Sequence, residues 1–345
     1  MSCGLPNKYA CPNELCCSSQ GWCGNSNDHC LDGCQLDYGN CGSNWVPTVG
    51  ALQASIGGQC GPGIAICSSG QCCSRAGWCG STTSHCAAPG CQPGYGTCDA
   101  DDVPSGRNTS QIRRNRIGNV PYGQAIYSCR DPGHVAMTFD DGPYLYTGDL
   151  LDILDEHDVK ATFFVTGNNL GKGAIDSETM PWREYITKAY EAGHQIGSHS
   201  WSHPNFDALT AWEQRVELYK NEMALVNILG MFPTYFRPPY GFCGALCLAT
   251  SGELGYHVII FDLDTKDYLH DSPDTIQQSK DIVKSFFDVR DWTTDHSVSI
   301  QHDVHYQTVY NLTEYSIEFI KEMGYEFVTV GECLGDPERN WYRSE

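Results

Sequence analysis

Two sets of eight cysteines, with nearly equal spacing, occupy the first 98 residues of this 345-residue chain. Both sets contain the pattern Cys-Cys-Ser-x-x-Gly-Trp-Cys-Gly, followed later by Gly-Cys-Gln. A segment of about forty residues cannot bury enough apolar surface to fold unaided, so disulfides must hold each repeat together. Adjacent cysteines and eight thiols in each unit argue against zinc sites. The two sets are Cys3, Cys11, Cys16, Cys17, Cys23, Cys30, Cys34 and Cys41, then Cys60, Cys67, Cys72, Cys73, Cys79, Cys86, Cys91 and Cys98.

Cysteine usage also indicates the compartment in which the chain folds. A chain with 20 cysteines is typical of an oxidising environment, so we expect secretion to the extracellular space or the cell wall. Two N-glycosylation sequons fit secretion, Asn108-Thr109-Ser110 and Asn311-Leu312-Thr313. No apolar run is long enough to span a bilayer. The first cysteine set begins at once, and we interpret Met1 as the start of a shortened chain whose leader has been removed.

The chain carries a net charge of −21, and nearly all of the negative excess falls after residue 125. A strongly anionic domain disfavours nucleic acid and anionic membranes as partners. It is compatible with a neutral or cationic polymer, and a merely solvated acidic surface is the alternative. Nothing in the sequence suggests more than a monomer.

Two segments are typical of linkers. Residues 43–58 contain turn residues without periodicity. Residues 100–124 are polar and include Arg113-Arg114-Asn115-Arg116, which we interpret as a solvated basic run rather than a nucleic-acid or processing site. The predicted units are therefore two repeats, 1–42 and 59–99, and a large domain, 125–345.

The large domain alternates apolar, strand-like runs with amphipathic, helix-like stretches. Repeated βα units imply a parallel sheet, here with enough units to close into a (β/α) barrel. Catalytic residues of such barrels lie at the carboxyl ends of the strands. The predicted strands are 134–140, 161–167, 194–199, 234–239, 256–263, 297–302 and 325–330. The predicted helices are 147–157, 181–192, 210–229, 244–254, 273–289 and 309–323.

Four further cysteines lie in this domain. Cys129 and Cys333 flank it, and we expect them to tie its ends together. Cys243 and Cys247 lie one helical turn apart, a separation that suits a local disulfide.

Five short segments at the ends of predicted strands carry the chemistry of a metal-dependent hydrolase. Asp141, His199 and His203 form a one-carboxylate, two-histidine set that suits Zn²⁺ and leaves positions for water and substrate. A similar set binds Fe(II) in oxygenases, so an oxidative enzyme is the alternative chemistry, although there the histidine usually precedes the acid. The segments are Thr138-Phe139-Asp140-Asp141, His199-Ser200-Trp201-Ser202-His203, Arg237-Pro238-Pro239-Tyr240-Gly241, Asp264-Thr265-Lys266-Asp267-Tyr268 and Ile300-Gln301-His302-Asp303.

The adjacent carboxylates Asp140 and Asp141 can divide the work. Asp141 binds the metal, while Asp140 removes a proton from the attacking water. Neighbouring carboxylates repel, so a cation is needed to keep the base ionised, and Arg237 is the candidate. Amide hydrolysis also needs oxyanion donors and an acid for the amine, and a cationic His302 beside an acid meets the last requirement.

The cysteine repeats resemble the hevein-type chitin-binding module. In that family a serine and aromatic side chains form a shallow platform for N-acetylglucosamine. The departures, Gln20 and Ala76 for an aromatic residue and histidine for the usual tyrosine, predict weak binding by each module and a gain from two on one chain. The alternative is a pair of stability scaffolds. The resemblance implies the pairs Cys3–Cys17, Cys11–Cys23, Cys16–Cys30, Cys34–Cys41, Cys60–Cys73, Cys67–Cys79, Cys72–Cys86 and Cys91–Cys98, and the platform residues Ser18, Trp22, His29, Ser74, Trp78 and His85.

The five segments resemble those of the NodB-type polysaccharide deacetylases, carbohydrate esterase family four, over residues 125–335. The resemblance implies a distorted (β/α) barrel. Its residue roles are Asp140 as base, Asp141, His199 and His203 as metal ligands, Arg237 orienting Asp140, the Tyr240 N–H as oxyanion donor and His302 as acid. An acid of the fourth segment, Asp264 rather than Asp267, would tune His302 or Arg237. Tyr268 replaces a usual tryptophan and Ile300 a leucine of the acetyl pocket, which leaves the subsite preference open.

Together the two resemblances imply a secreted, fungal chitin deacetylase. It would release acetate from N-acetylglucosamine units of chitin or chito-oligosaccharides and leave chitosan, with zinc as the metal and cobalt as a substitute. One alternative is an acetylxylan esterase of the same family, against which the chitin-binding modules weigh. Another is a lectin-like chitin-binding protein with an inactive barrel, but no ligand and no base is missing.

Overall fold

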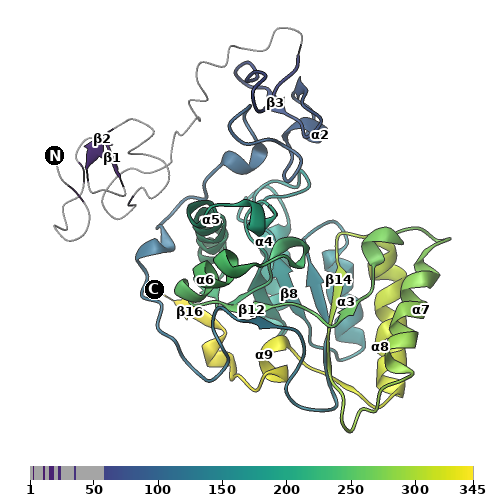
Figure 1. Cartoon of the computed structure of the whole chain (residues 1–345). Coiled ribbons are helices and arrows are strands. Elements are labelled where there is room, and N and C mark those ends of the chain that lie inside the picture. The colour runs from purple at the N-terminus through teal and green to yellow at the C-terminus, as the bar shows by residue number, and fades with distance from the viewer. Residues whose placement is uncertain are drawn as a thin grey trace.

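The computed structural model describes residues 58–344 and, before them, residues 3, 11, 15–18, 22–24 and 35. A small cysteine-rich unit, which contains β3 and α2, lies beside a much larger α/β domain (Figure 1). No helix in the described part of the chain is long and apolar enough to cross a membrane.

The cysteine-rich unit is a short antiparallel hairpin with one turn of helix. Strands β3 (Cys72–Cys73) and β4 (Cys79–Gly80) pair with Cys72 opposite Gly80, and α2 (Thr83–Cys86) follows. Because so small a unit has little apolar core, covalent links replace it. They are the predicted pairs Cys60–Cys73, Cys67–Cys79, Cys72–Cys86 and Cys91–Cys98.

The first repeat has the same hairpin wherever it is described. Strands β1 (Cys16–Cys17) and β2 (Cys23–Gly24) pair with Cys16 opposite Gly24, in the register of the second repeat. The predicted disulfides Cys3–Cys17 and Cys11–Cys23 are formed. Cys30, Cys34, Cys41 and His29 lie outside the described residues, and with them the predicted pairs Cys16–Cys30 and Cys34–Cys41.

The large domain is built on a parallel sheet, whose ten strands within the described residues run in the order β15-β6-β14-β7-β8-β9-β11-β12-β5, with β13 beside β14. Strand β12 pairs with β11, and β13, which directly follows it in the chain, pairs with β14. This one stretch of chain therefore closes the sheet into a distorted barrel, as expected. The strands are β5 (Ala125–Ile126), β6 (His134–Ala136), β7 (Thr138–Asp140), β8 (Thr162–Val165), β9 (Gln195–Ser198), β11 (Tyr235–Phe236), β12 (His257–Ile259), β13 (Leu263–Asp264), β14 (Ser297–His302) and β15 (Glu326–Phe327).

Helices cover the outside of the barrel (Figure 1). The longest, α5, begins at a capping box in which Thr210 and Glu213 bond each other's backbone N–H, and it ends at Gly230 in the left-handed region. An antiparallel pair, β10 (Met231–Pro233) and β16 (Tyr342–Ser344), brings the chain end to the same region. The helices are α3 (Thr147–Glu156), α4 (Trp182–Glu191), α5 (Ala211–Leu229), α6 (Ala245–Glu253), α7 (Ile276–Phe287), α8 (Thr313–Glu322) and α9 (Val330–Cys333).

The segment 100–124, predicted to be a linker, lies against α5 and α6. The hydroxyl of Thr109 donates to Glu222 of α5, and the Arg114 guanidinium forms two hydrogen bonds with the same carboxylate, at 2.8 and 2.6 Å. The interpretation of the basic run as solvated is therefore wrong for Arg114, whose side chain is 8 % exposed beside the fully buried Glu222. A buried carboxylate needs a paired cation, and this segment supplies it.

Two disulfides belong to the large domain. Cys129 is bonded to Cys333, which joins the start of the barrel to α9. Cys243 is bonded to Cys247 at the start of α6. Both are the predicted pairs.

Candidate active site

Asp141, His199 and His203 meet at the carboxyl ends of β7 and β9. Their ligand atoms all lie within 4.8 Å of one another. The Oδ1 atom of Asp141 is 3.1 Å from Nε2 of His203 and 3.6 Å from Nε2 of His199. Burial alone would raise the pKa of Asp141, but the histidines around it hold that pKa well below its ordinary value.

The residues present fit a divalent cation. Within the described part of the chain, the buried Oδ1 atom of Asp141 accepts no hydrogen bond. An unsatisfied carboxylate oxygen in such a place is costly unless a cation binds it. One carboxylate and two imidazoles form a donor set that suits zinc and leaves positions open for water and substrate.

Neighbouring groups fix the orientation of both histidines. Nδ1 of His199 donates to the Arg237 carbonyl at 2.7 Å, which leaves Nε2 to face Asp141. The loop that carries His203 is held by Glu217 of α5, which accepts from the N–H groups of Trp201 and Ser202 at 3.0 and 2.7 Å. Asp141 and His203 both have positive φ, at 76° and 59°. Such backbone conformations are uncommon for residues other than glycine and cluster at functional sites.

Asp140, the predicted base, forms a buried ion pair. Nη1 of Arg237 is 2.8 Å from its Oδ1 atom, and both side chains are almost fully buried. The guanidinium also donates to the Ile260 carbonyl at 2.9 Å and lies 4.3 Å from the Phe164 ring centre. Arg237 therefore balances the charge of Asp140 and fixes the direction in which its second oxygen points.

Tyr240 occupies a tight turn next to the metal-ligand cluster. The 3₁₀ turn Pro239–Gly241 places Tyr240 at φ 60°, and its ring centre lies 4.6 Å from that of His203. The N–H groups of Gly241 and Phe242 donate to the carbonyls of Pro238 and Pro239. The Tyr240 N–H between these prolines and Gly241 is the predicted oxyanion donor.

His302, the predicted acid, lies beside Asp140, the predicted base, because His302 of β14 and Asp140 of β7 are register partners on paired strands. Its Nδ1 atom is 2.8 Å from Asp267, and Asp267 also accepts from Thr308 at 2.8 Å. Burial disfavours the charged imidazole, but the carboxylate of Asp267 outweighs that effect and raises the pKa of His302 to about 10.

The preference for Asp264 as the carboxylate that tunes His302 is wrong. Asp264 accepts from the backbone N–H of Lys266 at 2.9 Å and from the Tyr268 hydroxyl at 3.2 Å. Lys266 has φ 54°, and the 3₁₀ turn Asp267–Leu269 that follows carries Asp267 into the interior. Arg237, the other group considered for tuning, pairs with Asp140 instead.

The two predicted substrate contacts differ in accessibility. Tyr268 is 46 % exposed, and its ring meets that of His302 edge to face with centres 5.5 Å apart. Ile300 is 7 % exposed on β14, two residues before His302. Tyr268 therefore lies on the rim beside the acid, and Ile300 forms part of the floor.

Sequence reasoning missed a buried pair under the metal-ligand cluster. Nζ of Lys172 donates to the carbonyls of Asp141 and Gly142 at 2.9 and 3.0 Å. Burial lowers the pKa of Lys172, and burial raises the pKa of Asp303, which accepts from the Thr147 hydroxyl. Asp303 is the last residue of the predicted catalytic segment Ile300-Gln301-His302-Asp303, so the sequence offered a signal for it. Lys172 lies in a loop without periodicity, and no sequence pattern indicated it.

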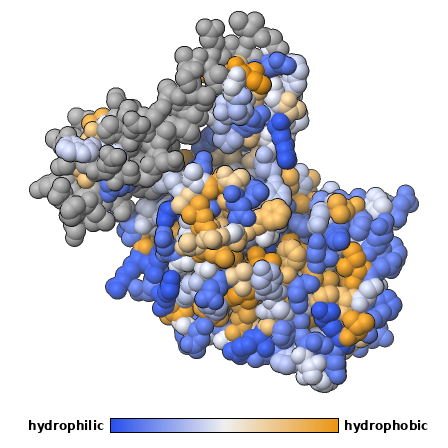
Figure 2. Space-filling view, in the orientation of Figure 1, coloured by the Kyte–Doolittle hydropathy of each residue, from blue (hydrophilic) through white to orange (hydrophobic). Residues whose placement is uncertain are grey.

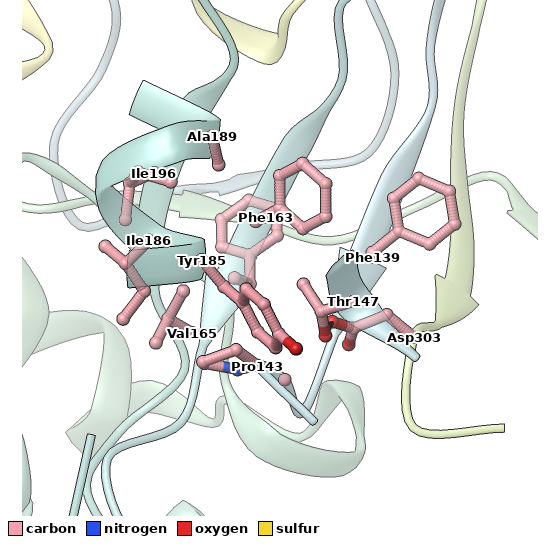
Figure 3. A pocket seen from close by; sticks show the side chains of 12 residues that line it. Phe139, Pro143, Thr147, Phe163, Val165, Tyr185, Ile186, Ala189, Ile196 and Asp303 are labelled. Carbon is pink, nitrogen blue, oxygen red and sulfur yellow. Dashed lines mark hydrogen bonds between the residues drawn. The ribbon is translucent and has the colours of Figure 1, made fainter. Parts of the chain in front are cut away.

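A small cavity lies behind this pair, between the strands and α4 (Figure 3). Apolar side chains make up most of its wall, including Phe139, Phe163 and Ile186, with Asp303 at one side. The lining includes none of Asp141, His199 and His203, so this cavity is separate from the metal-ligand cluster.

The predicted chitin platforms are alike in both repeats. Trp22 and Trp78 are 55 % and 49 % exposed. The backbone N–H of each donates to the serine four residues earlier, Ser18 at 3.1 Å and Ser74 at 3.2 Å. His85 packs over Gly80, where a Cβ would lie 2.6 Å from its ring, and its Nδ1 atom is 2.7 Å from the Thr82 hydroxyl.

Known proteins and protein families match separate parts of this chain. A family described as polysaccharide deacetylase matches residues 127–259, and one described as chitin recognition protein matches residues 2–41. A chitin deacetylase of Pestalotiopsis sp is 43 % identical over 240 residues, which cover 70 % of this chain and 76 % of that protein. One of Colletotrichum lindemuthianum is 39 % identical over 250 residues, which cover 72 % and 98 %.

A solved structure agrees with these matches. The chitin deacetylase from the fungal pathogen Colletotrichum lindemuthianum aligns with a TM-score of 0.63 at 41 % identity, over 66 % of this chain and 98 % of that one. The chain belongs to the polysaccharide deacetylase family, carbohydrate esterase family four.

Proposed function

We propose that this protein is a secreted, metal-dependent chitin deacetylase. It hydrolyses the N-acetyl groups of chitin or chito-oligosaccharides and gives acetate and chitosan. The observation that carries the proposal is the pair of register partners at the cluster, Asp140 held by Arg237 and His302 held by Asp267. The chitin-binding repeats and relatives that are named chitin deacetylases support chitin as the substrate.

The residues of the chain supply each step of amide hydrolysis. A divalent cation held by Asp141, His199 and His203, for which zinc is our candidate and cobalt a substitute, would acidify water and polarise the acetyl carbonyl. Asp140 takes a proton from the attacking water as the water oxygen bonds to the carbonyl carbon. The Tyr240 N–H donates to the oxyanion.

His302 completes the reaction. As the C–N bond breaks, its Nε2–H protonates the leaving amine, which would otherwise be a poor leaving group. Asp267 keeps His302 charged for this step by holding Nδ1–H. Tyr268 and Ile300 contact the sugar or the acetyl group beside the acid.

Further features support the assignment to the outside of the cell. Every cysteine that the structure describes is in a disulfide, which is typical of extracellular proteins. We assign residues 1–42 and 59–99 to chitin-binding modules and 125–345 to the deacetylase domain. We expect no nucleic-acid or membrane partner, and a monomer.

Acetate release tests the proposal. Chitin oligomers and acetylated xylo-oligomers are incubated side by side with the protein after chelation, and again after zinc or cobalt is returned. We expect metal-dependent release from the chitin oligomers. Release from the xylan alone would support an acetylxylan esterase, and no release from either by a protein that still binds chitin would support a lectin-like role.

A further inference from the structure

The second cysteine-rich module is docked on the catalytic domain. The N–H of Leu170, in the loop between β8 and α4, donates to the Ala88 carbonyl of the module at 2.9 Å. The methyl group of Thr83 in α2 packs so closely on Gly171 that a Cβ there would collide with it. Figure 1 shows the module over this end of the domain.

The peptide that leaves the module is bonded to the loop of the metal-ligand cluster. The 3₁₀ turn Asp99–Asp101 follows Cys98 directly. The Ala100 carbonyl accepts from the indole N–H of Trp201 and from Nζ of Lys220, both at 2.9 Å. Trp201 lies between the ligands His199 and His203 and is fully buried. Contacts on both sides of the module therefore fix its place relative to the cluster.

The sugar platform of this module stays open and lies near Tyr240. Trp78 is 49 % exposed although the module is docked. Arg75, next to Ser74 of the platform, lies within range of an electrostatic interaction with the Tyr240 side chain. Tyr240 in turn touches His203. Hydrophobic residues also gather on the surface below the module, in the area of α6 (Figure 2).

From these contacts we propose that the second module is a fixed outer subsite of the active site. One chain of N-acetylglucosamine units lies on Trp78 and Ser74, passes Arg75 and Tyr240, and presents an acetamide to the cluster. A module on a flexible tether only raises the local concentration of polymer. A fixed module instead binds the same chain that reacts, so it favours chains long enough to reach both places. This inference rests on the proposed function.

Chain-length preference tests the inference. The measured quantity is the ratio of kcat/KM for a chitin octamer to that for a trimer. We expect Trp78→Ala to lower this ratio about fivefold, the effect of one stacking contact. Trp22→Ala, the equivalent change in the first module, should lower retention on insoluble chitin but change the ratio much less. Ile64→Ala, an exposed position of the second module outside the platform, is the control for folding and should change neither.

A second variant separates docking from binding. Thr83→Arg places a long side chain where Gly171 leaves no room, so it should release the module while its platform stays intact. We expect the octamer-to-trimer ratio to fall as in Trp78→Ala, with retention on insoluble chitin preserved. Equal ratios in wild type, Trp78→Ala and Thr83→Arg, with acetate still released, would overturn the inference alone. A wild-type protein that releases no acetate from any chitin oligomer would instead overturn the proposed function.

Discussion

Two buried ion pairs beside the metal-ligand cluster carry their charges in opposite arrangements. In the first pair the proposed base is the carboxylate of Asp140, and its partner is the cation Arg237. In the second pair the proposed acid is the imidazole of His302, and its partner is the anion Asp267. Because Asp140 and His302 are register partners of neighbouring strands, the sheet sets their separation. The comparison shows that the strands fix the positions of Asp140 and His302. Their ion-pair partners, Arg237 and Asp267, determine whether each side chain is protonated.

Removal of the base should have the largest effect. Asp140→Asn keeps the size of the side chain but cannot accept the proton of the attacking water. We expect kcat for acetate release from chitin oligomers to fall by about 10²–10⁴-fold, the usual contribution of a general base. Retention on insoluble chitin serves as the control and should not change. Undiminished acetate release would show that Asp140 is not the base.

The effect of removing the proposed acid should depend on the leaving group, and this distinguishes the role of His302 from that of Asp140. His302→Gln removes the proton donor for the amine, so acetate release from chitin oligomers should fall by about 10²–10³-fold. The aryloxide of an aryl acetate is a good leaving group without protonation. The rate at which His302→Gln hydrolyses an aryl acetate should therefore fall far less. Asp140→Asn should slow both substrates equally. The same loss on both substrates in His302→Gln would contradict its role as acid.

Asp267, the ion-pair partner of His302, should determine the pH above which activity is lost, the alkaline limb of the pH profile. Asp267 raises the pKa of His302, and the reaction needs the protonated imidazole, so activity is lost as pH rises through that pKa. We expect Asp267→Asn to move the alkaline limb to lower pH and to reduce kcat about tenfold above neutrality.

Asp264→Asn is the matched control for this pH profile. Asp264 lies three residues earlier and bonds Lys266 and Tyr268 instead of His302. Its kcat profile should follow that of the wild type. A shift in Asp264→Asn and none in Asp267→Asn would reverse the assignment.

Changes at Tyr268, on the rim beside His302, should have the smallest effect. Tyr268→Phe removes the exposed hydrogen bond to Asp264 but keeps the ring that meets His302. We expect KM for chitin oligomers to rise about twofold at most, because one exposed neutral hydrogen bond adds little. Tyr268→Ala, which also removes the ring, should raise KM more. An equal effect of the two variants would assign the binding to the hydroxyl.

Much of this arrangement could be predicted from the sequence, because it depends on local patterns. Alternation of apolar runs and amphipathic stretches indicated the apolar runs that end in catalytic segments, and parallel strands bring their carboxyl ends to one edge. Two of the predicted strands, 134–140 and 256–263, are each divided into two strands in the structure. Asp141, His199 and His203 therefore meet as expected. The disulfide pairs of the second repeat likewise follow from its resemblance to a known module.

The parts that could not be predicted depend on turns and on buried polar side chains. The choice between Asp264 and Asp267 is decided by the left-handed backbone at Lys266, which no spacing indicates. Glu222 of α5 is buried and Glu217 is partly buried, although a helical pattern assigns charged residues to the solvent. Glu217 is bonded to the loop that carries His203, and Glu222 is bonded to Arg114. Because these partners are distant in the sequence, only the folded structure shows why a carboxylate is needed at each position.

Direct titration of His302 tests the central claim, that the partner of each reacting group sets its protonation. The imidazole nitrogens of histidine-labelled protein are followed by NMR against pH, with zinc present, in wild type, Asp267→Asn and Asp264→Asn. We expect His302 to stay protonated well above the ordinary pKa of histidine in the wild type and in Asp264→Asn, and to lose its proton at lower pH in Asp267→Asn. A wild-type His302 that titrates at the ordinary value, or one that Asp267→Asn leaves unchanged, would contradict the account.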